Sequence, residues 1–169
     1  MRAALDRLYD AAAWIAAAFM VGLRAMVLIG VAGRQFGFYM PGTDAYAGYL
    51  MAGAGFLSLA HTLKRNEHIR VTLLLSLSGP RTRRALERWS LAVALLLAAL
   101  LAFYSARLAW QSWKFNDIST GTDAAPLWIP QLSMAIGSLI LLVAFVDEAV
   151  LELRGRRAGA ASGEMQRVE

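Results

Sequence analysis

The chain has 169 residues, of which 58% are hydrophobic, and its mean hydropathy is +0.48. It contains no cysteine, which excludes disulfides, thiolate catalysis and cysteine-ligated metal sites on this chain. The formal net charge is +5. Because the basic residues stand beside apolar segments, we interpret their excess as a signal for membrane orientation rather than as a nucleic-acid-binding patch.

Four long apolar stretches occupy most of the chain. Asp, Glu, Lys and Arg are absent from residues 45–63, 89–106 and 124–146, and Arg24 is the exception within 11–33. A segment of about 20 apolar residues matches the bilayer's hydrocarbon core, which is about 30 Å thick. Helices of a soluble bundle would each show a polar face, and the last two stretches show almost none. We therefore predict an all-α integral membrane protein with four transmembrane helices.

The first predicted span covers about residues 10–33. The N-terminal run resembles a signal peptide, but acidic residues interrupt the segment before it and a second apolar run follows Arg24 directly. We therefore interpret this run as a retained helix rather than a cleaved leader.

Arg24 lies ten residues before Arg34, which places it about 15 Å below the outer boundary of the first span. An unpaired arginine near mid-membrane costs at least about 2.5 kcal/mol. Three interpretations remain open. Arg24 snorkels or bonds to helix carbonyls, pairs with a group on another subunit, or lines a substrate route.

The second predicted span, about residues 45–63, is rich in small residues. Gly48, Ala52 and Gly55 are spaced i, i+4, i+7 and so share one helix face. Small residues with this spacing allow close packing between helices in lipid. The alternative is that they line a substrate path.

Residues 64–79 begin with a basic group and continue with aliphatic residues, but the run is too short to span a bilayer. We predict a short cytoplasmic segment that lies along the membrane interface between helices two and three. Pro80 suits the first position of a helix, so a long helix is predicted from Pro80 to about Trp113, with its membrane span at about 86–110.

The connection 114–127 is polar and rich in turn residues, and the fourth span is predicted at about 126–148. Residues 1–152 are thus expected to form one transmembrane scaffold domain. Residues 153–169 are small and polar and are predicted to form a flexible cytoplasmic tail.

The basic residues are unevenly distributed between the two sides of this predicted frame. Thirteen of the seventeen precede the first span, follow the second or follow the fourth. The positive-inside rule then predicts that both termini and the 64–88 connection are cytoplasmic.

The sequence shows no residue pattern that is typical of a catalytic, cofactor or metal site. The stretches 45–63, 89–106 and 124–146 contain no acidic residue, which disfavours a self-sufficient proton-coupled exporter. His61 and His68 are seven residues apart near one end of a single span, so neither a haem between helices nor a zinc site is expected. We predict no catalytic, cofactor or metal residues and no enzyme activity.

A set of motifs in a characteristic order resembles one transporter family. Arg34 closes the first span, Asp44 opens the second, and a basic turn leads into His68, Ile69, Arg70 and Val71. Pro126-Leu-Trp-Ile-Pro130 and Gly137 follow at the fourth span. Over roughly residues 5–152 the chain resembles the small membrane (Q, or DctQ-like) subunit of tripartite ATP-independent periplasmic (TRAP) transporters. It departs from the usual pattern at Ala45, Glu67 and Thr72, where members commonly have Glu, Gly and Asp.

The resemblance implies a scaffold role in the bacterial inner membrane. The implied partners are a large (M) transmembrane subunit that carries the solute, a periplasmic solute-binding protein and the lipid bilayer. The implied process is ion-gradient-driven uptake of a small organic solute, with a carboxylate as the expected class. The alternative interpretation is a membrane-anchor subunit of a redox enzyme, which a haem absorption band would reveal. Candidate interface residues are Arg24, Arg34, Asp44, Gly48, Ala52, Gly55, His68 and Arg70.

Overall fold

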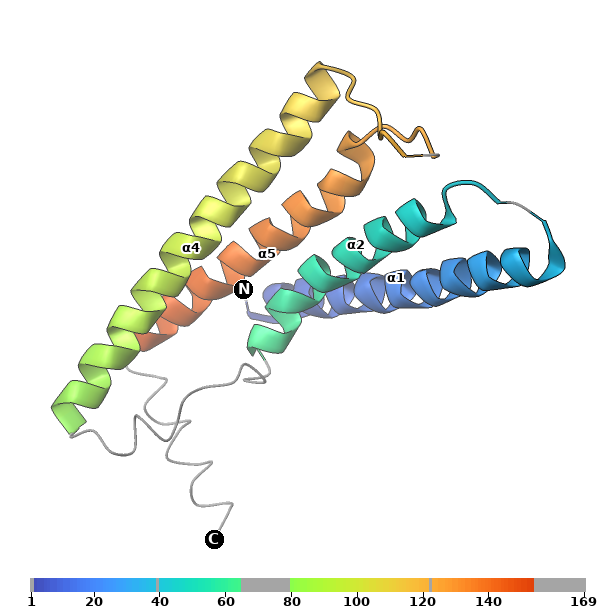
Figure 1. The fold of residues 1–169 in the computed structure, drawn as a ribbon. Coiled ribbons are helices and arrows are strands. Elements are labelled where there is room, and N and C mark those ends of the chain that lie inside the picture. Colours follow the sequence, from blue (N-terminus) through green and yellow to red (C-terminus); the bar gives the residue numbers. More distant parts are fainter. Residues whose placement is uncertain (1, 39, 65–79, 122, 154–169) are drawn as a thin grey trace, which may run out of the picture.

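The computed structural model describes residues 2–38, 40–64, 80–121 and 123–153. These residues form four α-helices and one isolated β-bridge. The helices, shown in Figure 1, are α1 (Arg2–Phe36), α2 (Thr43–Lys64), α4 (Pro80–Lys114) and α5 (Trp128–Leu153). The all-α prediction is confirmed for these residues, and the long helix begins at Pro80 as predicted.

Three of these helices are long and apolar enough to cross a membrane: α1 over Leu5–Phe36, α4 over Ala85–Lys114 and α5 over Trp128–Glu152. Their spans agree with the predicted ones, although α1 and α4 extend well beyond them. The 22-residue α2 does not reach the same hydropathy, because tyrosines, glycines and His61 dilute its aliphatic residues. The fourth span therefore stays a prediction. The expected interfacial segment, beyond Lys64, and the expected tail, beyond Leu153, lie outside the described residues.

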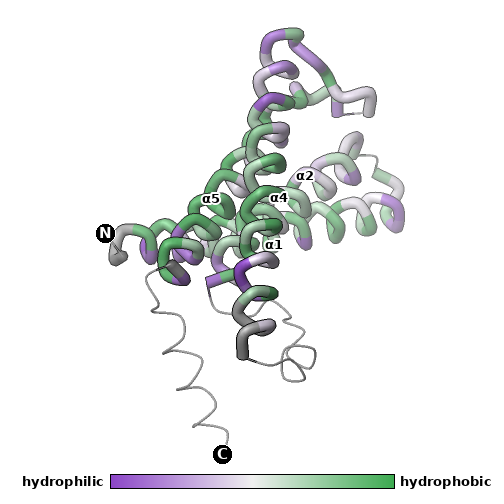
Figure 2. Tube along the Cα trace, turned by 90° about the vertical axis from the view of Figure 1, so that its left-hand side faces the viewer, coloured by the Kyte–Doolittle hydropathy of each residue, from purple (hydrophilic) through white to green (hydrophobic). Residues whose placement is uncertain are grey.

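The helices lie side by side in the order α1, α2, α5, α4, which differs from their order along the chain. α1 packs on α2, α2 on α5, and α5 on α4. The α1–α2 and α4–α5 connections lie at the same end of the molecule, which we call the outer end (Figure 1). Apolar residues dominate the middle of the helices, and polar residues gather at their ends and in the outer loops (Figure 2).

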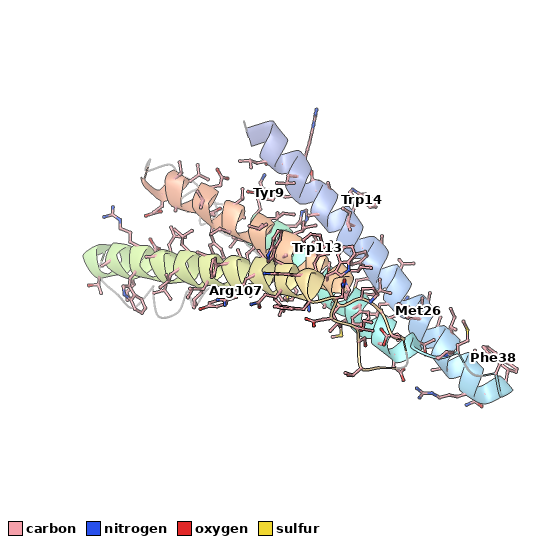
Figure 3. The ribbon with its side chains drawn as sticks, turned by 90° about the horizontal axis from the view of Figure 1, so that it is seen from above. Tyr9, Trp14, Met26, Phe38, Arg107 and Trp113 are labelled. Atoms are coloured by element: carbon pink, nitrogen blue, oxygen red, sulfur yellow. The ribbon has the colours of Figure 1, made fainter. Side chains whose placement is uncertain are left out.

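α4 packs against α5 through small residues. The buried side chains of α4 recur every three or four residues, and all are Ala or Ser: Ala98, Ala102, Ser105, Ala109 and Ser112. Their size lets the two helix backbones approach closely, which is the main source of helix association in lipid. The large side chains of α4 point away from this contact, and Trp113 on α4 and Trp14 on α1, both labelled in Figure 3, are more than half exposed.

α2 is held between its neighbours by two glycines. A Cβ on Gly53 would collide with the ring of Phe19 on α1, and a Cβ on Gly137 of α5 would lie 2.6 Å from the backbone carbon of Phe56 on α2. At the opposite, inner end, Tyr9 is only 1% exposed and belongs to a core with Ala60, Leu63, Leu141 and Ala144. This core joins α1, α2 and α5.

Candidate interaction surfaces

Arg34 and Asp44, which the sequence singled out, form an ion pair across the α1–α2 turn. The Arg34 Nη2 atom lies 3.2 Å from Asp44 Oδ2, and the two side chains are 72% and 87% exposed. Asp44 stands in the first turn of α2, where a carboxylate also favours the positive end of the helix. An ion pair this exposed contributes at most about 1 kcal/mol. It therefore orients the turn without holding it together.

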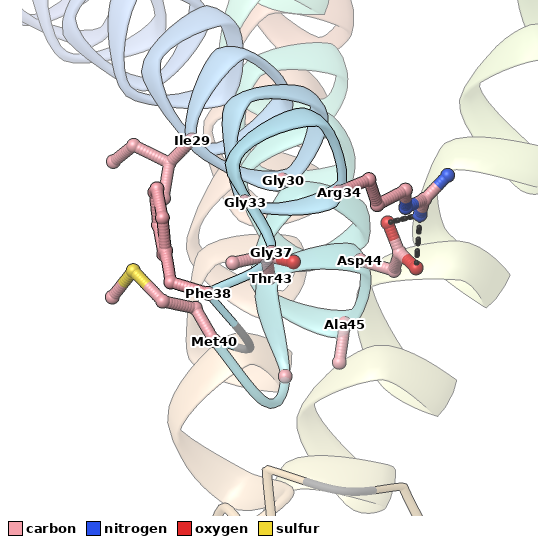
Figure 4. Close-up of a pocket in the computed structure, with 11 residues that line it drawn as sticks. Ile29, Gly30, Gly33, Arg34, Gly37, Phe38, Met40, Thr43, Asp44 and Ala45 are labelled. Atoms are coloured by element: carbon pink, nitrogen blue, oxygen red, sulfur yellow. Dashed lines mark hydrogen bonds and ion pairs between the residues drawn. The ribbon is translucent and has the colours of Figure 1, made fainter.

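A pocket of about 340 Å³ lies between the end of α1 and the start of α2 (Figure 4). Glycines line much of it, and Gly33 has a clear reason: a Cβ there would lie 2.7 Å from the carbonyl oxygen of Phe38. Phe38 and Met40 form part of the wall and are about half exposed. The lining is about equally polar and apolar and includes one ion pair, and it carries no nucleophile beside a base.

The α4–α5 loop has its own hydrogen-bonded structure. An antiparallel bridge pairs Ile118 with Pro126, and the amide of Ser119 donates to the carbonyl of Ala125 at 2.8 Å. Asn116 and Ala124 adopt positive φ angles of 50° and 45° at the bends. Such conformations are uncommon for residues other than glycine, so they indicate a loop held by its own contacts.

Asp123 is the central acceptor of this loop. Its carboxylate accepts hydrogen bonds from the Ser119 hydroxyl at 2.8 Å and from the Tyr49 hydroxyl of α2 at 3.0 Å. The hydrogen bond from Ser119 is the main reason that the pKa of Asp123 lies below its ordinary value, and Tyr49 lowers it further. Sequence reasoning identified the loop but missed this cluster. A serine, a glycine and an aspartate at alternate positions, 119, 121 and 123, were the available signal.

The two outer loops touch each other. A Cβ on Gly42, which is buried and has a φ of 82°, would lie 2.9 Å from the Cβ of Asp123. Together with the Tyr49 hydrogen bond, this contact joins two loops into one surface, which we call the outer platform and which consists of the described residues 37–38, 40–42, 115–121 and 123–127. The platform exposes large apolar side chains from both loops: Phe38, Met40, Phe115 and Ile118.

The inner end of the α1–α2 pair carries a second set of charges. Lys64 forms a salt bridge with Asp6 and lies 5.0 Å from the ring centre of Tyr9. Nδ1 of His61 lies 3.7 Å from Asp10 Oδ1, a contact that is ionic only when the histidine is protonated. These contacts fasten the two helices at the end opposite the outer platform. No group of three or more potential metal-binding side chains occurs in the described parts of the chain.

The predicted small-residue face of α2 is not packed against any described helix. Gly48, Ala52 and Gly55 are exposed, and no described atom lies within 4 Å of a Cβ placed on Gly48 or Gly55. α2 uses Gly53 for its close contact instead, because that position points between α1 and α5. The prediction that these three residues meet another subunit stays untested.

Of the remaining candidates, the structure describes Arg24. Arg24 is exposed on α1, with no ion pair or hydrogen bond to any residue that the structure describes. His68 and Arg70 lie outside the described residues. The structure thus brings Arg34 and Asp44 together and leaves Arg24 apart from them.

Long apolar helices with polar ends define a multi-pass membrane protein. Residues 23–155 match the family of tripartite ATP-independent periplasmic transporters, DctQ component. The chain belongs to this family and is a small membrane subunit of a TRAP-type transporter. The search of the curated proteins found no match.

Proposed function

We propose that this chain braces the large subunit of the transporter and helps to dock the periplasmic binding protein. The complex then takes up a small organic solute, of the carboxylate class, with energy from an ion gradient. In this proposal the chain itself carries no solute. Family membership supports the transporter over the redox anchor, because the family is a transporter component.

The proposed topology has four crossings of the bacterial inner membrane and cytoplasmic termini. α2 lies between α1 and α5, two helices that are apolar enough to span, so it crosses with them. Residues near the start of α1 and late in α5 meet in one core, which supports an even number of crossings. The excess of basic residues in the sequence segments before the first span, between the second and third, and after the fourth supports a cytoplasmic location for these segments.

The outer platform is the observation that carries the docking role. The contact of Gly42 with Asp123 and the Tyr49 hydrogen bond join two loops that are far apart in the sequence. A joined surface loses less conformational entropy on binding than two independent loops would. Its exposed apolar side chains face the periplasm in this topology, where the binding protein arrives.

The interface with the large subunit is proposed on α1 and α2. α2 is too polar to be a typical lipid-facing helix, and its exposed face presents glycines that leave the backbone thinly covered. A neighbouring transmembrane helix covers such a face better than lipid does, because close approach increases van der Waals contact.

The docking role is tested with one acidic substitution in each loop, Phe38→Asp and Ile118→Asp. The affinity of the binding protein for the complete membrane complex in nanodiscs is measured. Each variant is expected to bind about tenfold more weakly, because a charge replaces an apolar contact. Gln35→Glu, an exposed change at the end of α1, is the matched control and should bind normally.

If both aspartate variants bind the protein as tightly as the unchanged complex, docking occurs elsewhere and this part of the proposal is wrong. A haem absorption band in the purified complex would instead support the redox anchor.

A further inference from the structure

Arg24 lies midway between two markers of the membrane boundaries on α1. Trp14, whose side chain is 79% exposed, stands ten residues before it, and Arg34 stands ten residues after it. At 1.5 Å per residue, each marker is about 15 Å away along the helix axis. The 30 Å between the markers equals the approximate thickness of the hydrocarbon core, and exposed tryptophans favour its boundary. Arg24 is therefore near the middle of the membrane.

The helix face around Arg24 is otherwise apolar and uncovered. Its neighbours at i−4, i+3 and i+7 are Met20, Val27 and Val31, which are 56%, 49% and 51% exposed. The face points away from α2, since α1 meets α2 through Phe19 and Gly22. Arg24 is thus a single cation in an apolar stripe that no described helix covers.

The acidic residues closest to Arg24 in the sequence already contact other side chains. Asp10 and Asp44 are the nearest acidic residues along the chain, and none lies between them. Both already contact other basic side chains, Asp10 with His61 and Asp44 with Arg34. Within the described residues, Arg24 has neither an ion pair nor a hydrogen bond of its side chain.

Arg107 is a second exposed arginine on a predicted membrane-spanning helix, and it lies closer to the membrane boundary than Arg24 does. It lies on the exposed surface of α4, seven residues before Lys114 at the end of the helix (Figure 3). That is about 10 Å along the axis, within the range where a long side chain reaches the interface. Arg24 is farther from both boundaries, so snorkelling satisfies it less well.

We propose that Arg24 pairs with a carboxylate on a transmembrane helix of the large subunit, which packs on the stripe of Met20, Val27 and Val31. A guanidinium and a carboxylate can form two parallel hydrogen bonds, which satisfies both groups away from water. This inference rests on the proposed function and adds the chemistry of the contact. It concerns α1, whereas the small-residue face belongs to α2.

The test compares Arg24→Leu with the control Arg107→Leu, in the isolated subunit and in the complex. In the isolated subunit, Arg24→Leu should leave thermal stability in detergent unchanged or raised, because an unpaired charge is removed. In the complex, Arg24→Leu should raise the Kd between this chain and the large subunit about thirtyfold or more, because the partner's carboxylate is left buried and unpaired. Arg24→Lys should keep part of the affinity, and Arg107→Leu should keep all of it.

Photo-crosslinkers at Val27 and at Leu97, an exposed residue of α4, identify what covers each helix. Val27 should capture a large-subunit peptide that contains Asp or Glu, and Leu97 should capture lipid. The inference is overturned if Val27 captures only lipid, or if Arg24→Leu assembles as tightly as the unchanged protein. Failure of the unchanged chain to co-purify with the large subunit would instead contradict the proposed function itself.

Discussion

The small-residue faces of α4 and α2 share one spacing but have different surroundings. On α4, Ala98, Ala102 and Ser105 are spaced i, i+4, i+7 and are buried against α5. On α2, Gly48, Ala52 and Gly55 have the same spacing and are exposed. The comparison teaches that this spacing permits a close approach of helices but does not determine which neighbour provides it. Our proposal assigns the uncovered face of α2 to a partner helix.

The largest expected effect separates a covered glycine from an uncovered one. Gly137→Ala places a Cβ 2.6 Å from the backbone of Phe56, so α2 and α5 must move apart. We expect a loss of about 3 kcal/mol in the free energy of unfolding. Gly55→Ala meets no described atom and should be neutral or stabilise by up to about 1 kcal/mol, since alanine favours helix.

Reversible unfolding of the isolated subunit in mixed micelles measures both changes. Equal losses of unfolding free energy in Gly137→Ala and Gly55→Ala would show that the α2 face is covered within this chain. The difference between the faces of α4 and α2 would then not hold.

A second comparison uses the same larger substitution on each face. Ala102→Leu overfills the α4–α5 contact and should destabilise the isolated subunit by about 1–3 kcal/mol. Ala52→Leu should leave the isolated subunit unchanged and reduce recovery of the complex with the large subunit. Ala106→Leu, on an exposed position of α4, is the control for added bulk on a lipid-facing surface.

Size-exclusion chromatography of the co-expressed subunits gives the recovery. Normal assembly of Ala52→Leu would exclude this face as the interface.

The smallest expected effect concerns the pH response of the outer platform. Because folding lowers the pKa of Asp123, its stabilising contribution is fully present above the ordinary value of 3.8 and is lost as pH falls through the lowered pKa. Limited proteolysis of the 115–127 loop should therefore accelerate only at strongly acidic pH. Asp123→Asn should cleave faster at neutral pH and lose most of this acid dependence, because the weaker amide acceptor does not titrate. An unchanged acid response in Asp123→Asn would show that another group controls the loop.

The helices were predictable because their causes are local. Long apolar stretches predicted three helices that are long and apolar enough to cross a membrane, and Pro80 predicted the start of α4. The ion pair of Arg34 with Asp44 joins two residues that the sequence singled out separately, since a short turn brings them together.

The features that the sequence did not predict depend on contacts between residues far apart in the chain. The orientation of α2 is set by Phe19 against Gly53 and by Phe56 against Gly137, contacts between different helices that spacing within one helix does not encode. The Asp123 cluster depends on a hydrogen bond from Tyr49, 74 residues away in the chain, and on bends at two residues other than glycine. Composition predicted a polar loop there and could not predict its contacts.

Reconstituted uptake tests the central claim most directly. The binding protein, the large subunit and this chain are combined in proteoliposomes with labelled solute and an imposed ion gradient, and each component is omitted in turn. The account predicts uptake by the complete set, loss of uptake without this chain, and none from this chain with the binding protein alone. Gradient-driven uptake in vesicles that contain this chain as their only membrane component would contradict it.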